Sequence, residues 1–289
     1  MDRGRADDRE PGLSVRLIDS HAHLQAAAFA AEADEVAEAA RLAGVERVLV
    51  PGWDPASSRA SIELAARHEF IDASVGVHPH AAAEVDDEAW TAVASLAPDP
   101  HVVAIGETGL DYDRAFSPRE AQLANLRRNL ALALATGKPA ILHCRSRAGE
   151  RDAQDELIAE LTAADVGAPA WRAAFGVRPP ALLHSFSGPV EYAEAALDLG
   201  LAISFSGLAF RAGEEPTAIV ARLVPDDRLL VETDSPYLSP PGAPRRRNEP
   251  PWAEVTARWL AERRGVSADA LGELLVANYD RIFRPAGSA

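Results

Sequence analysis

Two histidines separated by one residue end the first apolar run of the sequence, Ile18-Asp19-Ser20-His21-Ala22-His23. Side chains on a strand alternate between its two faces, so His21 and His23 point to the same side, as two ligands of one metal must. Imidazole nitrogen suits zinc, manganese, iron or nickel. A single histidine near a strand end is more often an ordinary polar residue. Two at this spacing favour a metal-binding site.

Several later apolar runs also end in ionisable residues. The segments concerned are GVHPH at 76–80, GETGLDY at 106–112, HCR at 143–145, HSFSG at 184–188 and VETDSPYL at 231–238. Any one such residue could be neutralised by a hydrogen-bonding partner. Burying so many of them together would be costly without a compensating cation. The joint pattern therefore predicts a metal centre to which several strands contribute.

Eight short apolar runs alternate with segments of helical composition, and they must position these residues. We predict strands at Val15–Asp19, Arg47–Pro51, Ile71–Val77, Val102–Gly106, Pro139–His143, Ala181–His184, Leu201–Ser204 and Leu229–Glu232. Eight such units favour an α/β fold of the (β/α)8 TIM-barrel type, in which active sites lie at the carboxyl ends of the strands. The alternative is a doubly wound open sheet, but a phosphate-binding glycine motif is missing at the first strand.

We predict a single barrel domain over residues 15–285. A charged leader, residues 1–14, precedes it, and we expect this leader to be disordered. Beyond the last strand, Trp252–Arg264 and Ala268–Phe283 are typical of terminal helices packed outside the barrel. The one cysteine, Cys144, excludes an intrachain disulfide framework and fits a cytoplasmic location. No run approaches 18 apolar residues, so no membrane span is expected. These patterns leave the oligomeric state open.

The formal net charge of −15 argues against a stable non-specific nucleic-acid binder, which normally needs a basic surface. It does not exclude an enzyme that acts on phosphodiesters. Bound divalent metals would reverse the local charge at an acidic site.

Glu107 decides how many metals we expect. Some two-metal barrels bridge their ions with a carbamylated lysine, but Lys138, the only lysine, precedes the fifth strand and so lies at the opposite end from the inferred site. Glu107 is the better bridging carboxylate. Asp234, beyond the last strand, could bind a metal and take the proton from a metal-bound water.

Taken in order, these motifs and RNEP at Arg247–Pro250 resemble the TatD family of metal-dependent deoxyribonucleases in the amidohydrolase superfamily. The resemblance runs from about Leu17 to Phe283. It implies a hydrolase acting on ester bonds that cleaves DNA, often trimming single strands from the 3′ end, and sometimes RNA. DNA, or RNA, would then be a substrate rather than a stably bound partner. The cofactors would be two divalent ions, drawn from zinc, magnesium, manganese, iron and nickel.

The resemblance also assigns roles to individual residues. His21 and His23 would hold one metal together with Asp234, Glu107 would be shared, and His143 and His184 would complete the second site. The catalytic residues would be Asp234 and Glu107. The residues expected to contact substrate are His78, Arg145, Arg247 and Asn248.

Two segments depart from the family pattern and keep other substrates open. The connection 146–180 is longer than a minimal helix and turn, and the loop Phe210–Pro216 carries Glu214 and Glu215, where a nucleic-acid enzyme would be expected to be more basic. The alternatives are another amidohydrolase reaction, on a lactone, amide or phosphotriester, and a non-catalytic scaffold. Asp19 is expected to form structural hydrogen bonds. For Glu232, support of a ligand and packing remain equally open.

Overall fold

A computed structural model describes residues 16–244 and 247–285. The predicted leader, 1–14, lies outside the described residues. Eight strands follow one another in the sheet in sequence order, and each neighbouring pair is parallel. They are β1 Leu17–Asp19, β2 Val45–Pro51, β3 Ile71–Val75, β4 Val102–Asp111, β5 Ala140–Arg145, β6 Ala181–Leu183, β7 Ala202–Phe205 and β8 Leu229–Val231.

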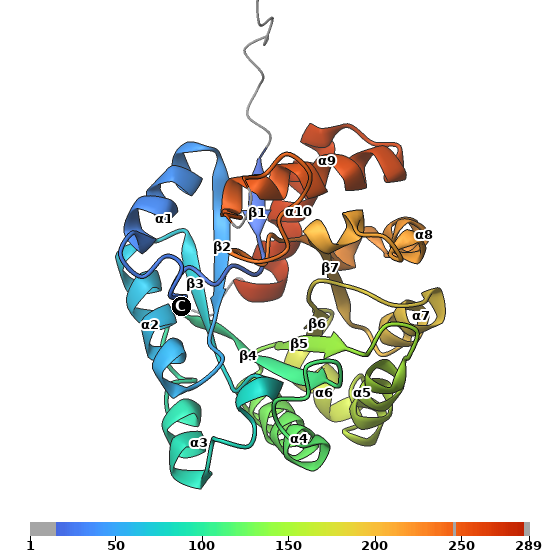
Figure 1. The fold of residues 1–289 in the computed structure, drawn as a ribbon. Helices are drawn as coiled ribbons and strands as arrows, with labels where there is room; N and C mark the ends of the chain where they lie inside the picture. The colour runs from blue at the N-terminus through green and yellow to red at the C-terminus, as the bar shows by residue number, and fades with distance from the viewer. Residues whose placement is uncertain (1–15, 245–246, 286–289) are drawn as a thin grey trace, which may run out of the picture.

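Contacts between the first and last strands bring the sheet round into a barrel. Ser20 N donates to Val231 O at 3.0 Å, and Ala22 forms an isolated parallel bridge with Ser235. Figure 1 shows the strands in the middle of the molecule with the helices arranged around them. The predicted (β/α)8 barrel is confirmed.

The helices cover the outside of the strands. They are α1 Ala33–Leu42, α2 Pro55–Arg67, α3 Asp87–Ala94, α4 Arg119–Thr136, α5 Asp152–Ala163, α6 Pro169–Phe175, α7 Val190–Asp198, α8 Glu215–Leu223, α9 Ala253–Arg264 and α10 Ala268–Phe283. Short 3₁₀ turns lie at η1 Pro79–Ala81, η2 Gly207–Phe210, η3 Asp226–Arg228 and η4 Pro250–Trp252. In residues 16–244 and 247–285, no helix has the length and apolar character needed to cross a membrane.

The strands form the centre of the core because both of their faces are covered. Val48, Leu49 and Val50 of β2 are all completely buried. A parallel sheet buried on both faces needs such continuous apolar runs, which is why the strands could be located in the sequence. On the outside, Asp54 begins α2 by accepting a hydrogen bond from Ser57 N at 2.7 Å.

The structure corrects the predicted elements in two ways. Helices α3, α6 and α8 were not predicted, and the long connection 146–180 contains α6 in addition to the longer α5. Strand β4 does not end at Gly106 but continues to Asp111, because residues 108–111 keep pairing with β5. Glu107 and Asp111 therefore lie on one strand, which matters for the site.

Candidate metal centre

The carboxyl ends of the strands bring together seven ionisable side chains that are far apart in the sequence. They are His21 and His23 after β1, His78 after β3, Glu107 in β4, His143 in β5, His184 after β6 and Asp234 after β8. The six predicted metal ligands are therefore all in one cluster. His78, which we predicted to contact substrate, is also part of it.

Glu107 lies at the centre of this cluster, and its two carboxylate oxygens face different histidines. Oε2 is 3.3 Å from His21 Nε2 and 3.6 Å from His23 Nε2. Oε1 is 2.9 Å from His184 Nε2, 3.1 Å from His143 Nδ1 and 3.2 Å from His78 Nε2. This division of the two oxygens is the geometry expected of a carboxylate shared between two sites.

Around Oε2, His21 and His23 form one group with Asp234. The Nε2 atoms of His21 and His23 are 3.2 Å apart, and Asp234 Oδ1 is 3.3 Å from His23 Nε2. The backbone of Asp234 is left-handed, with φ of 56°, a conformation that aspartate adopts more readily than most residues. Its N–H donates to His21 O at 2.9 Å, which ties the end of β8 to the end of β1.

Around Oε1, the second group consists of histidines from three strands. His143 Nδ1 and His184 Nε2 are 3.3 Å apart, and His78, Glu107 and His143 offer atoms close enough to hold one ion. Gly109 of β4 makes this approach possible. A Cβ atom at this position would lie 1.9 Å from His143 O. The φ angle of Gly109 is 138°, which residues other than glycine rarely adopt.

The donor atoms of this cluster fit a metal better than they fit one another. Glu107 is 2% exposed, and its Oε2 accepts no hydrogen bond from the part of the chain that the structure describes. The Nε2 atoms of His21 and His23 can either share one proton in a hydrogen bond or both present a lone pair to one ion, while the Nδ1 atoms of both rings have no partner among the described residues. Imidazole and carboxylate are the ligand types of zinc, manganese, iron and nickel sites.

Of the three histidines beside Glu107 Oε1, two, His184 and His143, are each supported by a buried carboxylate. Glu232, which is completely buried, lies 3.2 Å from His184 Nδ1 through its Oε1 atom. The same oxygen accepts hydrogen bonds from Ser185 N and Ser185 Oγ, both at 2.6 Å. Glu232 thereby fixes the His184 ring so that Nε2 faces Glu107. Of the two roles left open for Glu232, this geometry gives it the support of a candidate ligand.

Asp111 plays the matching role for His143, and sequence analysis did not identify it. Its Oδ2 lies 3.2 Å from His143 Nε2 and 2.8 Å from His80 Nε2. Its Oδ1 accepts from Arg114 N at 2.8 Å and from Asp113 N at 3.1 Å. Asp111 thus orients His143 Nδ1 toward Glu107. The signal in the sequence was the spacing of Glu107 and Asp111, four residues apart and so on one face of a strand.

Charge and burial act in opposite directions on these groups. Burial opposes ionisation of Glu107, yet His78, His184 and His21, with a hydrogen bond from His143, hold its pKa well below the usual value. Burial likewise works against His184, but Glu107 and Glu232 raise the pKa of His184 well above normal. Despite its burial, Glu232 has a pKa lowered to about 2 by His184. These shifts favour the ionised form of both carboxylates, of Glu107 among the histidines and of Glu232 behind His184.

Asp19 has the structural role that was expected. It is completely buried, and its carboxylate accepts from Thr233 N at 2.9 Å, Thr233 Oγ1 at 2.5 Å and His21 N at 3.2 Å. Burial raises the pKa of Asp19 to about 8, although these hydrogen bonds oppose the shift. The residue holds the ends of β1 and β8 together beneath the cluster.

The remaining residues expected to contact substrate have other partners. Arg145 Nη2 lies 2.6 Å from Asp113, and Arg247 pairs with Glu32 at 2.9 Å and with Glu249. Asn248 is completely buried and donates to Thr233 O at 2.8 Å and Tyr237 O at 2.5 Å. With these partners Asn248 anchors the loop after β8, and its contact with substrate stays a prediction.

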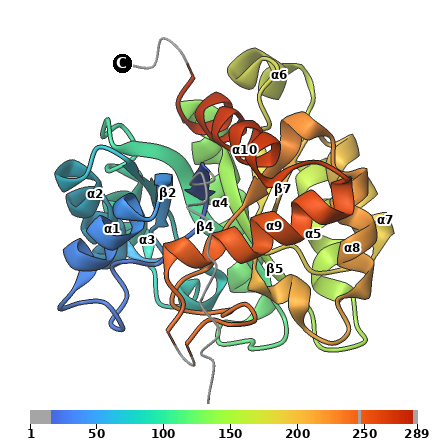
Figure 2. The same ribbon diagram turned by 90° about the horizontal axis from the view of Figure 1, so that it is seen from above.

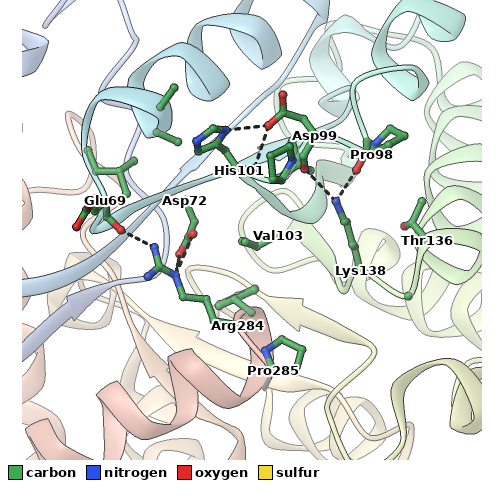
Figure 3. A pocket seen from close by; sticks show the side chains of 18 of the residues that line it. Glu69, Asp72, Pro98, Asp99, His101, Val103, Thr136, Lys138, Arg284 and Pro285 are labelled. Atoms are coloured by element: carbon green, nitrogen blue, oxygen red, sulfur yellow. Dashed lines mark hydrogen bonds and ion pairs between the residues drawn. The ribbon is translucent and has the colours of Figure 1, made fainter. Parts of the chain in front are cut away.

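The opposite end of the barrel has a cavity of about 1140 Å³, but its charged groups do not converge (Figure 3). Arg284 lies 2.8 Å from Asp72 Oδ2, and Lys138 Nζ donates to Ala97 O at 2.5 Å. Figure 2 shows α6 and the end of α10, both of which contribute to this cavity, at one end of the molecule. Lys138 therefore lies far from the cluster, as predicted.

Comparison with known proteins agrees with the geometry. The family model described as TatD related DNase matches residues 18–284. The protein named 3′-5′ ssDNA/RNA exonuclease TatD of Erwinia billingiae is 36% identical over 275 residues, covering 93% of this chain and 99% of that protein. An uncharacterized metal-dependent hydrolase of Bacillus subtilis is 32% identical over 269 residues, with coverage of 93% and 99%.

Among solved structures, a TatD homologue from Escherichia coli superposes with a TM-score of 0.81 at 27% identity, covering 94% of this chain and 99% of that one. These similarities extend over almost the whole barrel, including every segment that contributes to the cluster. The prediction of a metal-dependent hydrolase that acts on phosphodiester bonds is confirmed. The chain belongs to the TatD related DNase family.

Proposed function

We propose that the chain is an exonuclease that removes nucleotides from the 3′ end of single-stranded DNA, and of RNA, with two divalent metal ions held on either side of Glu107. The observation that carries this proposal is the division of Glu107, whose Oε2 faces His21 and His23 while its Oε1 faces His78, His143 and His184. The name of the relative from Erwinia billingiae supports the substrate and the polarity.

The assignment of ligands follows the two groups. His21, His23 and Asp234 would hold the first ion, His143 and His184 the second, and Glu107 both; His78 is close enough to serve the second ion or a substrate oxygen. When bound, divalent ions of this kind lower the pKa of a water and offset the negative charge that develops on a phosphodiester. Metal elemental analysis would identify the ions.

The side chains of the chain itself supply orientation and proton transfer. Asp234 is 13% exposed at its side chain and lies at the open side of the first group, where its carboxylate can orient a water and accept its proton. Glu232 and Asp111 keep His184 and His143 turned toward Glu107. Exclusion of bulk water from the buried floor formed by His21 and Glu107 strengthens each of these interactions.

A single experiment tests activity, polarity and the role of Asp234. Single-stranded DNA and RNA oligonucleotides labelled at the 3′ or 5′ end are followed over time, with and without a chelator. We expect a ladder of single-nucleotide steps from the 3′ end that requires divalent metal. Asp234→Asn should lower kcat by about 100-fold or more, the usual contribution of a general base.

Asp280→Asn is the matched control, because Asp280 pairs with Arg47 on the surface of α10. It should retain wild-type activity. Full activity of Asp234→Asn would refute the role of that residue. A preference of the wild-type protein for lactones, amides or phosphotriesters over both nucleic acids would overturn the proposed substrate.

We also propose that the protein is cytoplasmic, because a chain with a single cysteine has no intrachain disulfide and suits a reducing compartment.

A further inference from the structure

Among the described residues, the two arginines that were expected to contact substrate are each paired with a carboxylate. Arg145 is engaged by Asp113, and Arg247 by Glu32. The chain as a whole carries a net charge of −15. Groups other than Arg145 and Arg247 are therefore candidates for holding a nucleic-acid strand beside the cluster.

Exposed aromatic rings lie directly beside the cluster. The ring of Tyr237 is 5.7 Å from that of His23, and the ring of Phe116 is 4.8 Å from that of His80. Phe116 is 68% exposed and Tyr237 is 56% exposed, which is unusual for rings of this size. Isolated exposed apolar residues are normal on a protein surface, so exposure alone would not single them out.

These two rings stand on opposite sides of Glu107. Tyr237 adjoins His23, which faces Glu107 Oε2 at 3.6 Å. Phe116 adjoins His80, whose ring lies 4.3 Å from that of His78, and His78 faces Glu107 Oε1 at 3.2 Å. A phosphodiester bound over Glu107 would therefore have one aromatic ring toward each of its two nucleosides.

The loop that carries Phe116 is held in place by hydrogen bonds on both sides of the ring. Before it, Asp111 accepts from Asp113 N and Arg114 N. After it, the buried Ser117 donates to His80 O at 2.8 Å and accepts from Ala83 N at 3.0 Å.

The backbone at Tyr237 is fixed in a similar way. Its N–H donates to Asp234 O at 2.7 Å, and its carbonyl accepts from Asn248 at 2.5 Å. Both rings are thus solvent-exposed on ordered backbone, so binding against them costs little conformational entropy.

We propose that Phe116 and Tyr237 are stacking positions for the nucleobases on the two sides of the scissile phosphodiester, and that they make the site selective for single strands. This inference rests on the proposed nuclease function. Bases of a single strand present open π-faces to such rings, whereas bases inside a duplex are already stacked and paired.

The test compares substrates with and without bases. Wild-type protein, Phe116→Ala and Tyr237→Ala are each given a single-stranded oligothymidylate, the same strand with abasic sites at the two terminal positions, and bis(4-nitrophenyl) phosphate, a minimal diester. We expect the KM for oligothymidylate to rise about 5-fold to 100-fold in each alanine variant. The preference for oligothymidylate over the abasic strand should fall by the same factor. Phe116→Trp should restore it.

Leu42→Ala is the matched control, because Leu42 is 72% exposed at the end of α1 and contacts no part of the cluster. It should behave as wild type on all three substrates. The inference is overturned if the wild-type protein cleaves abasic and base-containing strands equally well, or if the alanine variants change kcat rather than KM. Failure of the wild-type protein to cleave both the oligonucleotide and the minimal diester would instead refute the proposed nuclease function itself.

Discussion

The two ends of the barrel both carry buried or half-buried charge, but they differ in how that charge is satisfied. At the amino ends of the strands, Asp72 accepts hydrogen bonds from Arg284 and from Tyr279, and Lys138 donates to backbone carbonyls. At the carboxyl ends, Glu107 is surrounded by histidine nitrogens while its Oε2 accepts no hydrogen bond from the described residues.

The cations at the amino end match the dipoles of the helices. Helices run opposite to the strands, so their carbonyl ends lie there, and Arg178 donates to Gly137 O after α4 and to Ile282 O in the last turn of α10, both at 3.2 Å. That end has the 1140 Å³ cavity, yet its Arg284, Lys138 and Arg178 are held by Asp72 and by backbone carbonyls. Cavity size therefore does not mark the active end of this barrel. The carboxyl end differs in that several candidate metal ligands converge there, and among the described residues Glu107 Oε2 has no hydrogen-bond partner.

Removal of metal should produce the largest difference between the two ends. We expect dialysis against EDTA to reduce hydrolysis of single-stranded DNA to background, because the donor atoms around Glu107 need a cation. The far-UV circular dichroism should persist, since the core and the paired charges at the amino end need no ion. Activity should return with divalent ions. Undiminished activity of a demonstrably metal-free protein would contradict the comparison.

The carboxylates that orient the histidines should have an intermediate effect. Asp111→Asn and Glu232→Gln leave the donor set intact but weaken the hold on His143 and His184. Metal affinity or activity should fall about 10-fold to 100-fold in each. Isothermal titration with the metal measures this. Affinities equal to wild type would show that Asp111 and Glu232 only pack.

Substitution at the amino end should have the smallest effect on activity. Asp72→Asn weakens the acceptor that Arg284 and Tyr279 share. We expect the free energy of unfolding in urea to fall by about 1–3 kcal/mol. Metal affinity and kcat should equal those of wild type. A loss of metal affinity in Asp72→Asn would mean that the two ends of the barrel are energetically coupled, and it would contradict the independence of the two ends that we infer.

Much of the fold could be predicted because the strands of a parallel barrel are buried on both faces and therefore appear in the sequence as continuous apolar runs. All eight strands were located, with errors at their ends. The end of β4 was the most consequential error, since placing it at Gly106 left both Glu107 and Asp111 outside the strand and hid the face that they share. The pairing of residues 108–111 with β5 is a tertiary contact that no local pattern reveals.

The predicted ligands came together because they lie at or just beyond the carboxyl ends of strands, which meet at one end of a parallel barrel. Partners that are distant in sequence could not be found in this way. Arg247 meets Glu32 across 215 positions, and the burial of Asn248 depends on the path of the loop after β8. The exposed rings of Phe116 and Tyr237 carry no sequence signal that separates them from core aromatics.

The metal content of Glu107→Gln tests the central claim most directly, because it asks whether this one carboxylate serves two ions. Wild-type protein, Glu107→Gln and the surface control Glu46→Gln, whose carboxylate pairs with Arg16, are loaded with metal, desalted and measured by plasma mass spectrometry. We expect two ions per chain in wild type and control, and fewer than one in Glu107→Gln with its circular dichroism unchanged. One ion in the wild type, or two retained in Glu107→Gln, would contradict the account.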